Sequence, residues 1–245
     1  MRLLLPILLL AAVLAVAAWR WSLRAEGKAE RVIVAFGDSI TEGIGPPGSV
    51  RWPDVLQARL AASTDGGSIA VVNRGISGNR LLRDNLGPAG LKRFDHDVLG
   101  QRGVAWVIVQ IGINDLGIPG SAEPGAPRVT AQQLIDGYQH LVGKARAAGL
   151  KVYGCTLLPF EGAEAGFYAA DKEPVRAAVN AWIRSPSAFD AVIDFDRVLR
   201  VPEHPARMLP AYDTGDHLHP GDRGQQALGD AVDLRLFRSA GGTRP

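Results

Sequence analysis

The chain has 245 residues, of which 47% are hydrophobic and 21% are charged, a balance that excludes a disordered protein. This length suffices for one α/β domain with a full core. The formal net charge is only +2 and no run of Lys or Arg stands out, so nucleic-acid binding has no electrostatic footprint here.

The N-terminus carries an apolar run over residues 3–19, preceded by Arg2 and interrupted only by Pro6. A short basic start before an apolar stretch is typical of an export signal, and residues 15–17 (Ala-Val-Ala) offer a cleavage site. Trp19 and nearby Trp21 are equally suited to anchor a membrane-spanning helix at the interface. We expect residues 1–26 to be either a signal peptide or an N-terminal membrane anchor, and both place the following domain outside the cytoplasm. A membrane anchor would also imply that the protein associates with a membrane. A lipoprotein anchor is not expected, because no cysteine lies near this segment.

Five short runs rich in β-branched residues follow, and each is mostly apolar rather than alternating between apolar and polar residues. Such runs indicate strands of a sheet that is covered on both faces. The runs lie at residues 32–36, 69–73, 106–111, 152–157 and 191–195.

Amphipathic stretches separate these runs, and their apolar residues recur at helical spacing. We expect helices over residues 52–62, 130–149, 175–183 and 222–237. Thr130 with Gln133 resembles a capping box at the start of the second, and Gly149 stands where a glycine ends a helix. The alternation predicts an α/β fold: one doubly wound domain over residues 30–240, with functional groups at the carboxyl ends of its parallel strands.

The chain has a single cysteine, Cys155, within the fourth predicted strand. One cysteine cannot form an internal disulfide, and no cysteine-protease signature surrounds this one. We expect Cys155 to be a small buried core residue.

Four short polar segments stand at strand ends or before the last helix. They are Gly-Asp-Ser at residues 37–39, Ile-Ser-Gly-Asn at 76–79, Gly-Ile-Asn-Asp at 112–115 and Asp-His-Leu-His-Pro at 216–220. The first three follow the first three predicted strands, so the fold is expected to gather them at one edge of the sheet.

These segments supply the parts of an acyl-transfer site. A serine hydroxyl needs a base to remove its proton, and His219 can serve Ser39 in that way. Asp216, three residues before His219, can hold the imidazole in the correct tautomer. His217 could take the place of His219, and Asp213 could take the place of Asp216, but only His219 stands three residues after Asp216.

The charge that develops on the substrate oxygen needs donors. The backbone N–H groups of Ser39 and Gly78 and the side-chain amide of Asn114 can form such an oxyanion hole. We expect Asp38 and Asp115 to support the turns beside them.

Together and in this order, the four segments resemble the GDSL/SGNH hydrolase superfamily, although the first reads Gly-Asp-Ser-Ile instead of Gly-Asp-Ser-Leu. The resemblance identifies Ser39, Gly78, Asn114 and His219 as the four named residues, with Asp216 completing the Asp-x-x-His block. It implies a three-layer αβα flavodoxin-like sandwich with a five-stranded parallel sheet, no cofactor or metal, and esterase or lipase-type activity. Residues 74–82, 112–117 and 215–220 look closest to the arylesterase/acylhydrolase branch linked to xylan degradation. That branch implies small acyl esters, acetyl above all, of small molecules or a polysaccharide.

Several alternatives stay open at this point. A lysophospholipase or thioesterase of the same fold would act on longer acyl groups. The cluster Asp213, Asp216, His217 and His219 could instead hold the metal of a phosphoesterase, although the chain has no His-Glu-x-x-His pair. A non-catalytic carbohydrate- or lipid-binding module is a third possibility.

Two further groups of residues have candidate roles. Ser77 is a second candidate nucleophile, and neither serine stands in a Gly-x-Ser-x-Gly elbow. Candidate pocket-lining residues are Trp52, Arg80, Phe160 and Tyr168.

Overall fold

The computed structural model describes residues 31–63, 68–164 and 166–238. The signal peptide or anchor predicted over residues 1–26 lies outside the described residues. Within the described ranges, no helix combines the length and the apolar character needed to cross a membrane.

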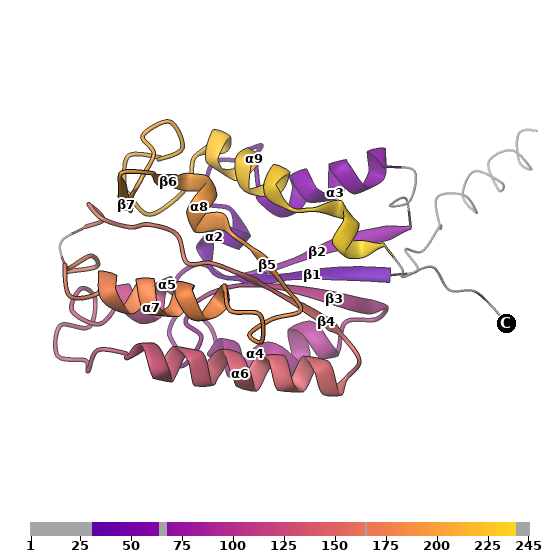
Figure 1. Cartoon of the computed structure of the whole chain (residues 1–245), viewed down its shortest axis with the longest axis horizontal. Helices are drawn as coiled ribbons and strands as arrows, with labels where there is room; N and C mark the ends of the chain where they lie inside the picture. Colours follow the sequence, from indigo (N-terminus) through magenta and orange to yellow (C-terminus); the bar gives the residue numbers. More distant parts are fainter. Residues whose placement is uncertain (1–30, 64–67, 165, 239–245) are drawn as a thin grey trace, which may run out of the picture.

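A five-stranded parallel sheet forms the centre of the molecule, in the order β2-β1-β3-β4-β5 (Figure 1). This order is that of a flavodoxin-like fold, and it confirms the predicted fold class. The strands are β1 (Arg31–Gly37), β2 (Ile69–Gly75), β3 (Val104–Gln110), β4 (Lys151–Cys155) and β5 (Ala191–Ile193).

Helices cover both faces of the sheet. One layer holds α3 (Trp52–Ala62), α8 (Phe195–Leu199) and α9 (Asp222–Ala231); the other holds α4 (Gly90–Phe94), α6 (Ala131–Ala147) and α7 (Glu173–Ile183) (Figure 1). Shorter elements complete the fold: α2 (Ser39–Glu42), α5 (Ile113–Gly117), the π-helical turn η1 (Asp95–Leu99), the 3-10 helix η2 (Leu234–Phe237) and an antiparallel pair of β6 (Arg200–Val201) and β7 (His204–Met208).

Alternation along β1 shows why both faces are apolar. Ile33 and Ala35 pack in the core beneath α3 and α9, whereas Val32, Val34 and Phe36 pack in the core beneath α4 and α6. All five side chains are buried, as the continuous apolar run predicts.

Most predicted elements appear within a few residues of their expected bounds. The capping box of Thr130 and Gln133 is present at the start of α6, and Gly149 follows that helix with a φ of 77°. Cys155 is buried at the end of β4, where desolvation raises the pKa of its thiol well above the ordinary value. The predicted core role of Cys155 is therefore confirmed.

The last predicted helix, residues 222–237, is wrong in its second half. The α-helix ends at Ala231 and Val232 is extended, after which the Asp233 carboxylate accepts from the Arg235 N–H at 2.9 Å and starts η2. Because the chain changes direction after Ala231, the Phe237 ring packs edge-on against Trp106, with ring centroids 5.7 Å apart. Helix α4, the turn η1 and the β6–β7 pair were not predicted, because each is too short to show a period.

The carboxyl ends of β1, β2 and β3 lie together at the edge of the sheet where α2 and α5 are found (Figure 1). Because β1 is central among the three, the chain winds away from it in opposite directions, and side chains from three loops meet at this point. The fold therefore gathers the first three polar segments of the sequence.

We predict that Leu56→Ala destabilises the domain by about 2–5 kcal/mol, because Leu56 is fully buried between α3 and the sheet and its removal leaves a cavity. Leu86→Ala deletes the same atoms from a side chain that is 61% exposed and should change the free energy of unfolding by less than about 0.5 kcal/mol. Urea denaturation of both variants measures the difference; equal losses would contradict this account of the core.

Candidate active site

The turn after β1 presents the hydroxyl of Ser39. Asp38 caps α2: its side chain accepts from the Ile40 N–H at 3.1 Å, and its carbonyl accepts from the N–H groups of Thr41 and Glu42. Ser39 is thus the first residue of α2, and its position in the turn is held by Asp38. The N–H groups of a helix's first turn have no partner within the helix, so the Ser39 N–H is free of such a bond.

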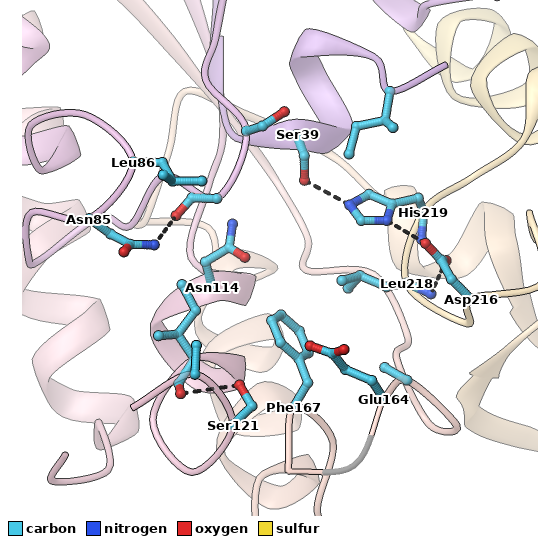
Figure 2. Close-up of a pocket in the computed structure, with 16 residues that line it drawn as sticks. Ser39, Asn85, Leu86, Asn114, Ser121, Glu164, Phe167, Asp216, Leu218 and His219 are labelled. Carbon is cyan, nitrogen blue, oxygen red and sulfur yellow. Dashed lines mark hydrogen bonds and ion pairs between the residues drawn. The ribbon is translucent and has the colours of Figure 1, made fainter. Parts of the chain in front are cut away.

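A chain of two hydrogen bonds links Ser39, His219 and Asp216. Ser39 Oγ lies 2.9 Å from His219 Nε2, and His219 Nδ1 lies 2.6 Å from Asp216 Oδ2. Figure 2 shows the serine hydroxyl pointing at the imidazole, with Asp216 behind it. The structure thus brings together three predicted residues, two of which are 180 positions apart.

Backbone donors fix the Asp216 carboxylate. Its Oδ1 accepts from the N–H groups of Leu218 and His219 at 2.9 and 2.8 Å. Partial burial acts to raise the pKa of Asp216, but these bonds and the His219 ring outweigh it and hold the pKa at about 2. Asp216 is ionised at neutral pH and can accept the Nδ1 proton of the imidazole.

Gly78 and Asn114 line the same pocket as Ser39 and His219, and Figure 2 shows Asn114 across this pocket from His219. Gly78 has a φ of +68°, and a Cβ there would approach Leu86 Cδ1 to 2.8 Å, so glycine suits both the conformation and the space. Asn114 Nδ2 donates to the Asn79 carbonyl at 3.1 Å. An amide nitrogen carries two hydrogens, so one donor of Asn114 stays available to the pocket that it lines.

Asp115 ties the Asn114 helix to the loop that carries Gly78. Its two carboxylate oxygens accept from the Leu81 and Leu82 N–H groups at 2.6 and 2.9 Å. Burial raises the pKa of Asp115 to about 6 despite these bonds. Its contacts are those of a supporting residue, as the sequence suggested.

Three supporting residues were missed by sequence reasoning. Glu42 accepts from both the backbone N–H and the hydroxyl of Ser77, while Asn79 and Arg93 bond each other at 2.9 Å behind the Gly78 loop. For Asn79, its position directly after Gly78 was the one feature of the sequence that could have indicated a role near the site. Arg93 lies on a helix that no periodicity revealed.

The contacts of His217, Asp213 and Ser77 decide between the alternative catalytic residues that the sequence offers. His217 Nδ1 lies 2.6 Å from Asp213 Oδ2, so this pair is separate from Ser39. The Ser77 hydroxyl donates to Glu42, and among the described residues no histidine is hydrogen-bonded to it. Across the described ranges, no three His, Cys, Asp or Glu side chains converge in a way that could hold a metal ion.

A pocket of about 370 Å³ opens in front of Ser39 (Figure 2). Much of its lining is apolar, including Ile44, Leu86, Ile118, Phe167 and Leu218.

None of the four predicted pocket-lining residues lies there. Trp52 and Phe160 are fully buried in the core, Arg80 pairs with Glu123 at 2.8 Å, and Tyr168 packs edge-on against Phe160. These four expectations were wrong because residues near the site in sequence point into the core or toward other loops.

Asp38, directly before the serine, is an ionisable group with no exposed surface. Its Oδ1 caps α2, but its Oδ2 has no hydrogen-bond partner among the described residues. Burial is the main cause that raises the pKa of Asp38 to about 7, and the nearby Asp115 carboxyl adds to it.

Residues 35–227 match the model of the GDSL-like Lipase/Acylhydrolase family. Among curated proteins, the uncharacterized lipoprotein YqeF of Bacillus subtilis is 28% identical over 139 residues, which cover 55% of this chain and 51% of that protein. Esterase TesA of Pseudomonas aeruginosa is 33% identical over 124 residues, covering 51% of this chain and 53% of TesA. The chain therefore spans about half the length of the curated relatives it matches.

Among solved structures, a variant of Axe2, an acetyl xylan esterase from Geobacillus stearothermophilus, superimposes with a TM-score of 0.62. The match covers 83% of this chain and 93% of that one at 24% identity. At this identity the likeness concerns the fold alone.

We predict that Asp38→Asn becomes more stable relative to the wild type as pH rises from 4 to 7. In the wild type, the raised pKa means that the native state holds a proton which the unfolded chain has already lost, so stability falls over this window. Asn keeps the cap of α2 but does not titrate. The difference in the free energy of unfolding between Asp38→Asn and the wild type, measured by urea denaturation, should therefore shift by about 2–4 kcal/mol in favour of Asp38→Asn over this pH range. Asp136→Asn, the same change on the exposed side of α6, is the control, and a difference for Asp38→Asn that does not vary with pH would refute the prediction.

Proposed function

The chain belongs to the GDSL-like lipase/acylhydrolase family, and we propose that it is a serine esterase that forms an acyl-enzyme on Ser39. The observation that carries the proposal is the pair of hydrogen bonds linking Ser39, His219 and Asp216. A hydroxyl, a base and a carboxylate in this order are the parts of an activated nucleophile.

In the first step, Ser39 Oγ attacks the ester carbonyl carbon while His219 Nε2 takes the hydroxyl proton. The imidazole is then positively charged, and the ionised Asp216 at 2.6 Å stabilises it. The tetrahedral intermediate collapses when the bond to the alcohol oxygen breaks, and His219 returns its proton to that oxygen. The products are the free alcohol and an acyl ester of Ser39.

In the second step, a water molecule attacks the acyl carbon and His219 takes one of its protons. The bond to Ser39 Oγ breaks, the proton passes to that oxygen, and the carboxylic acid leaves. The enzyme is restored without any cofactor.

We assign the oxyanion hole to the Ser39 N–H, the Gly78 N–H and the Asn114 side-chain amide. Gly78 and Asn114 line the same pocket as Ser39 and His219, so both donors can face a carbonyl oxygen bound there. Donors fixed in advance stabilise developing charge without a reorganisation cost.

For the acyl group we propose a small one, with acetyl as the first expectation. The name of the structural relative Axe2, an acetyl xylan esterase, supports an acetyl ester of a polysaccharide or small molecule. The pocket supports a second candidate, a longer acyl group, because much of its lining is apolar, including Leu86, Ile118 and Phe167. The apolar side chains that line it suit such a chain.

The rival functions have weaker support. A metal-dependent phosphoesterase needs Asp213, Asp216, His217 and His219 to converge on one ion, yet these four form two separate pairs. A non-catalytic binding module gives no reason for Ser39 to be hydrogen-bonded to the imidazole.

We further propose that residues 30–240 form the hydrolase domain and that it acts outside the cytoplasm. The family match over residues 35–227 supports the first part. The apolar segment at residues 3–19 supports the second, as a signal peptide or anchor, and so does the name of the relative YqeF, a lipoprotein.

Ser39→Ala should lower kcat for ester hydrolysis by roughly four to six orders of magnitude, because the nucleophile is lost. Ser63→Ala is the matched control, since the Ser63 hydroxyl donates to the Leu60 carbonyl at the end of α3 and does not line the pocket. A fluorophosphonate probe should label the wild type and Ser63→Ala but not Ser39→Ala. Near wild-type turnover in folded Ser39→Ala, or a loss that follows Ser77→Ala instead, would refute the nucleophile assignment.

The acyl preference is tested by rates on p-nitrophenyl esters of increasing chain length, beside acetylated xylan. We expect the acetate to have the highest kcat/KM, and acetate release from xylan, if the acetyl proposal holds. A kcat/KM that rises steadily toward six or eight carbons would favour the longer-chain candidate and leave the Ser39 mechanism intact.

A further inference from the structure

Arg93 is a buried cation behind the active site. Its side chain donates to the Gly37 carbonyl at 2.7 Å, the Arg74 carbonyl at 2.9 Å, Asn79 Oδ1 at 2.9 Å and Asp97 Oδ2 at 2.7 Å. Only one of these four acceptors is a carboxylate. The other three are neutral oxygens at the end of β1, near the end of β2 and in the loop that carries Gly78.

The position of the Gly37 carbonyl links Arg93 to the nucleophile. Gly37 is the last residue of β1, two positions before Ser39, and its carbonyl also accepts from the Ile76 N–H at 3.2 Å. The guanidinium lies 4.0 Å from the centre of the Phe36 ring, which fixes its plane against the same strand. Arg93 thus joins the start of the nucleophile turn to the end of β2.

Asn79 links Arg93 to the oxyanion donors. While Asn79 Oδ1 accepts from Arg93, its Nδ2 donates to the Pro88 carbonyl at 2.8 Å. Its backbone carbonyl accepts from Asn114 Nδ2. This carbonyl decides which amide hydrogen of Asn114 is occupied and which one faces the pocket, and Asn79 is also the next residue after Gly78.

We infer that Arg93 is a positioning residue for catalysis, which sets the distance between the Ser39 turn and the Gly78–Asn114 donors through Asn79. The inference rests on the proposed esterase function. The planar guanidinium can reach four oxygens in fixed directions, and a lysine ammonium in the same space cannot. The guanidinium touches no substrate; it acts through the groups that do.

A purely structural role is the competing explanation, and Arg176 provides the matched control. It is another buried arginine with two carbonyl acceptors, Leu157 and Pro205, and it pairs with Asp196 and Glu173 away from the pocket. Arg93→Lys and Arg176→Lys should both lower Tm. Only Arg93→Lys should lower kcat on p-nitrophenyl acetate, by about 10- to 100-fold with KM changed less than about threefold, since the full loss of one oxyanion donor costs about 10²–10³.

A double-mutant cycle separates positioning from general loosening. Asn114→Ala alone should lower kcat by about 10²–10³-fold. If Arg93 acts through that amide, Arg93→Lys should add less than about threefold in the Asn114→Ala background, whereas independent effects would multiply. If Arg93→Lys does not fold, Asn79→Ala replaces it, because that change removes the link and leaves the bonds of Arg93 to both strand ends.

The outcomes distinguish the two proposals. If the wild type hydrolyses esters and Ser39→Ala does not, the esterase function holds. The inference about Arg93 is then overturned if the kcat of Arg93→Lys lies within threefold of wild type, or if the effects of Arg93→Lys and Asn114→Ala multiply in the cycle. Asn79→Ala with unchanged kcat overturns it as well. A wild type without Ser39-dependent ester hydrolysis overturns the function itself.

Discussion

The site depends on a contact between two ends of the chain, because Ser39 lies on α2 and His219 lies just before α9. Gln225 in α9 holds these helices together: its Oε1 accepts from the Trp52 N–H at 2.9 Å and its Nε2 donates to the Ile40 carbonyl at 3.0 Å. One buried amide therefore joins α9 to the start of α3 and to Ile40, the residue after Ser39. These two hydrogen bonds hold the segment after His219 against the helix that begins at Ser39.

The opposite side of the site depends on the sheet. Parallel pairing of β1 with β2 and β3 fixes where their carboxyl ends lie, and each end continues into a loop or short helix that carries one of the proposed oxyanion donors. Asp115 then fastens the Gly78 loop to α5 through two backbone N–H groups. The proposed oxyanion donors are consequently held by backbone and buried side chains rather than by flexible surface groups, as preorganised stabilisation of charge requires.

Three buried ionisable groups lie behind the proposed catalytic residues. Asp38, Arg93 and Asp115 are all at most 5% exposed, and desolvation raises the pKa values of both acids. Burying such groups costs stability unless their hydrogen bonds offset it. Their presence at the strand ends indicates that geometry around Ser39 takes precedence over stability there.

The sequence by itself determined the layers and the chemistry. Continuous apolar runs specified a sheet covered on both faces, and the spacing of Asp216 and His219 specified a dyad, because each signal lies within a few adjacent residues. Tertiary structure alone decided that Ile44, Leu86 and Phe167 line the pocket while Trp52 and Phe160 do not, and that Arg93 reaches three separate segments. Those contacts depend on side-chain directions and on packing between distant segments, and no local period or motif in the chain encodes them.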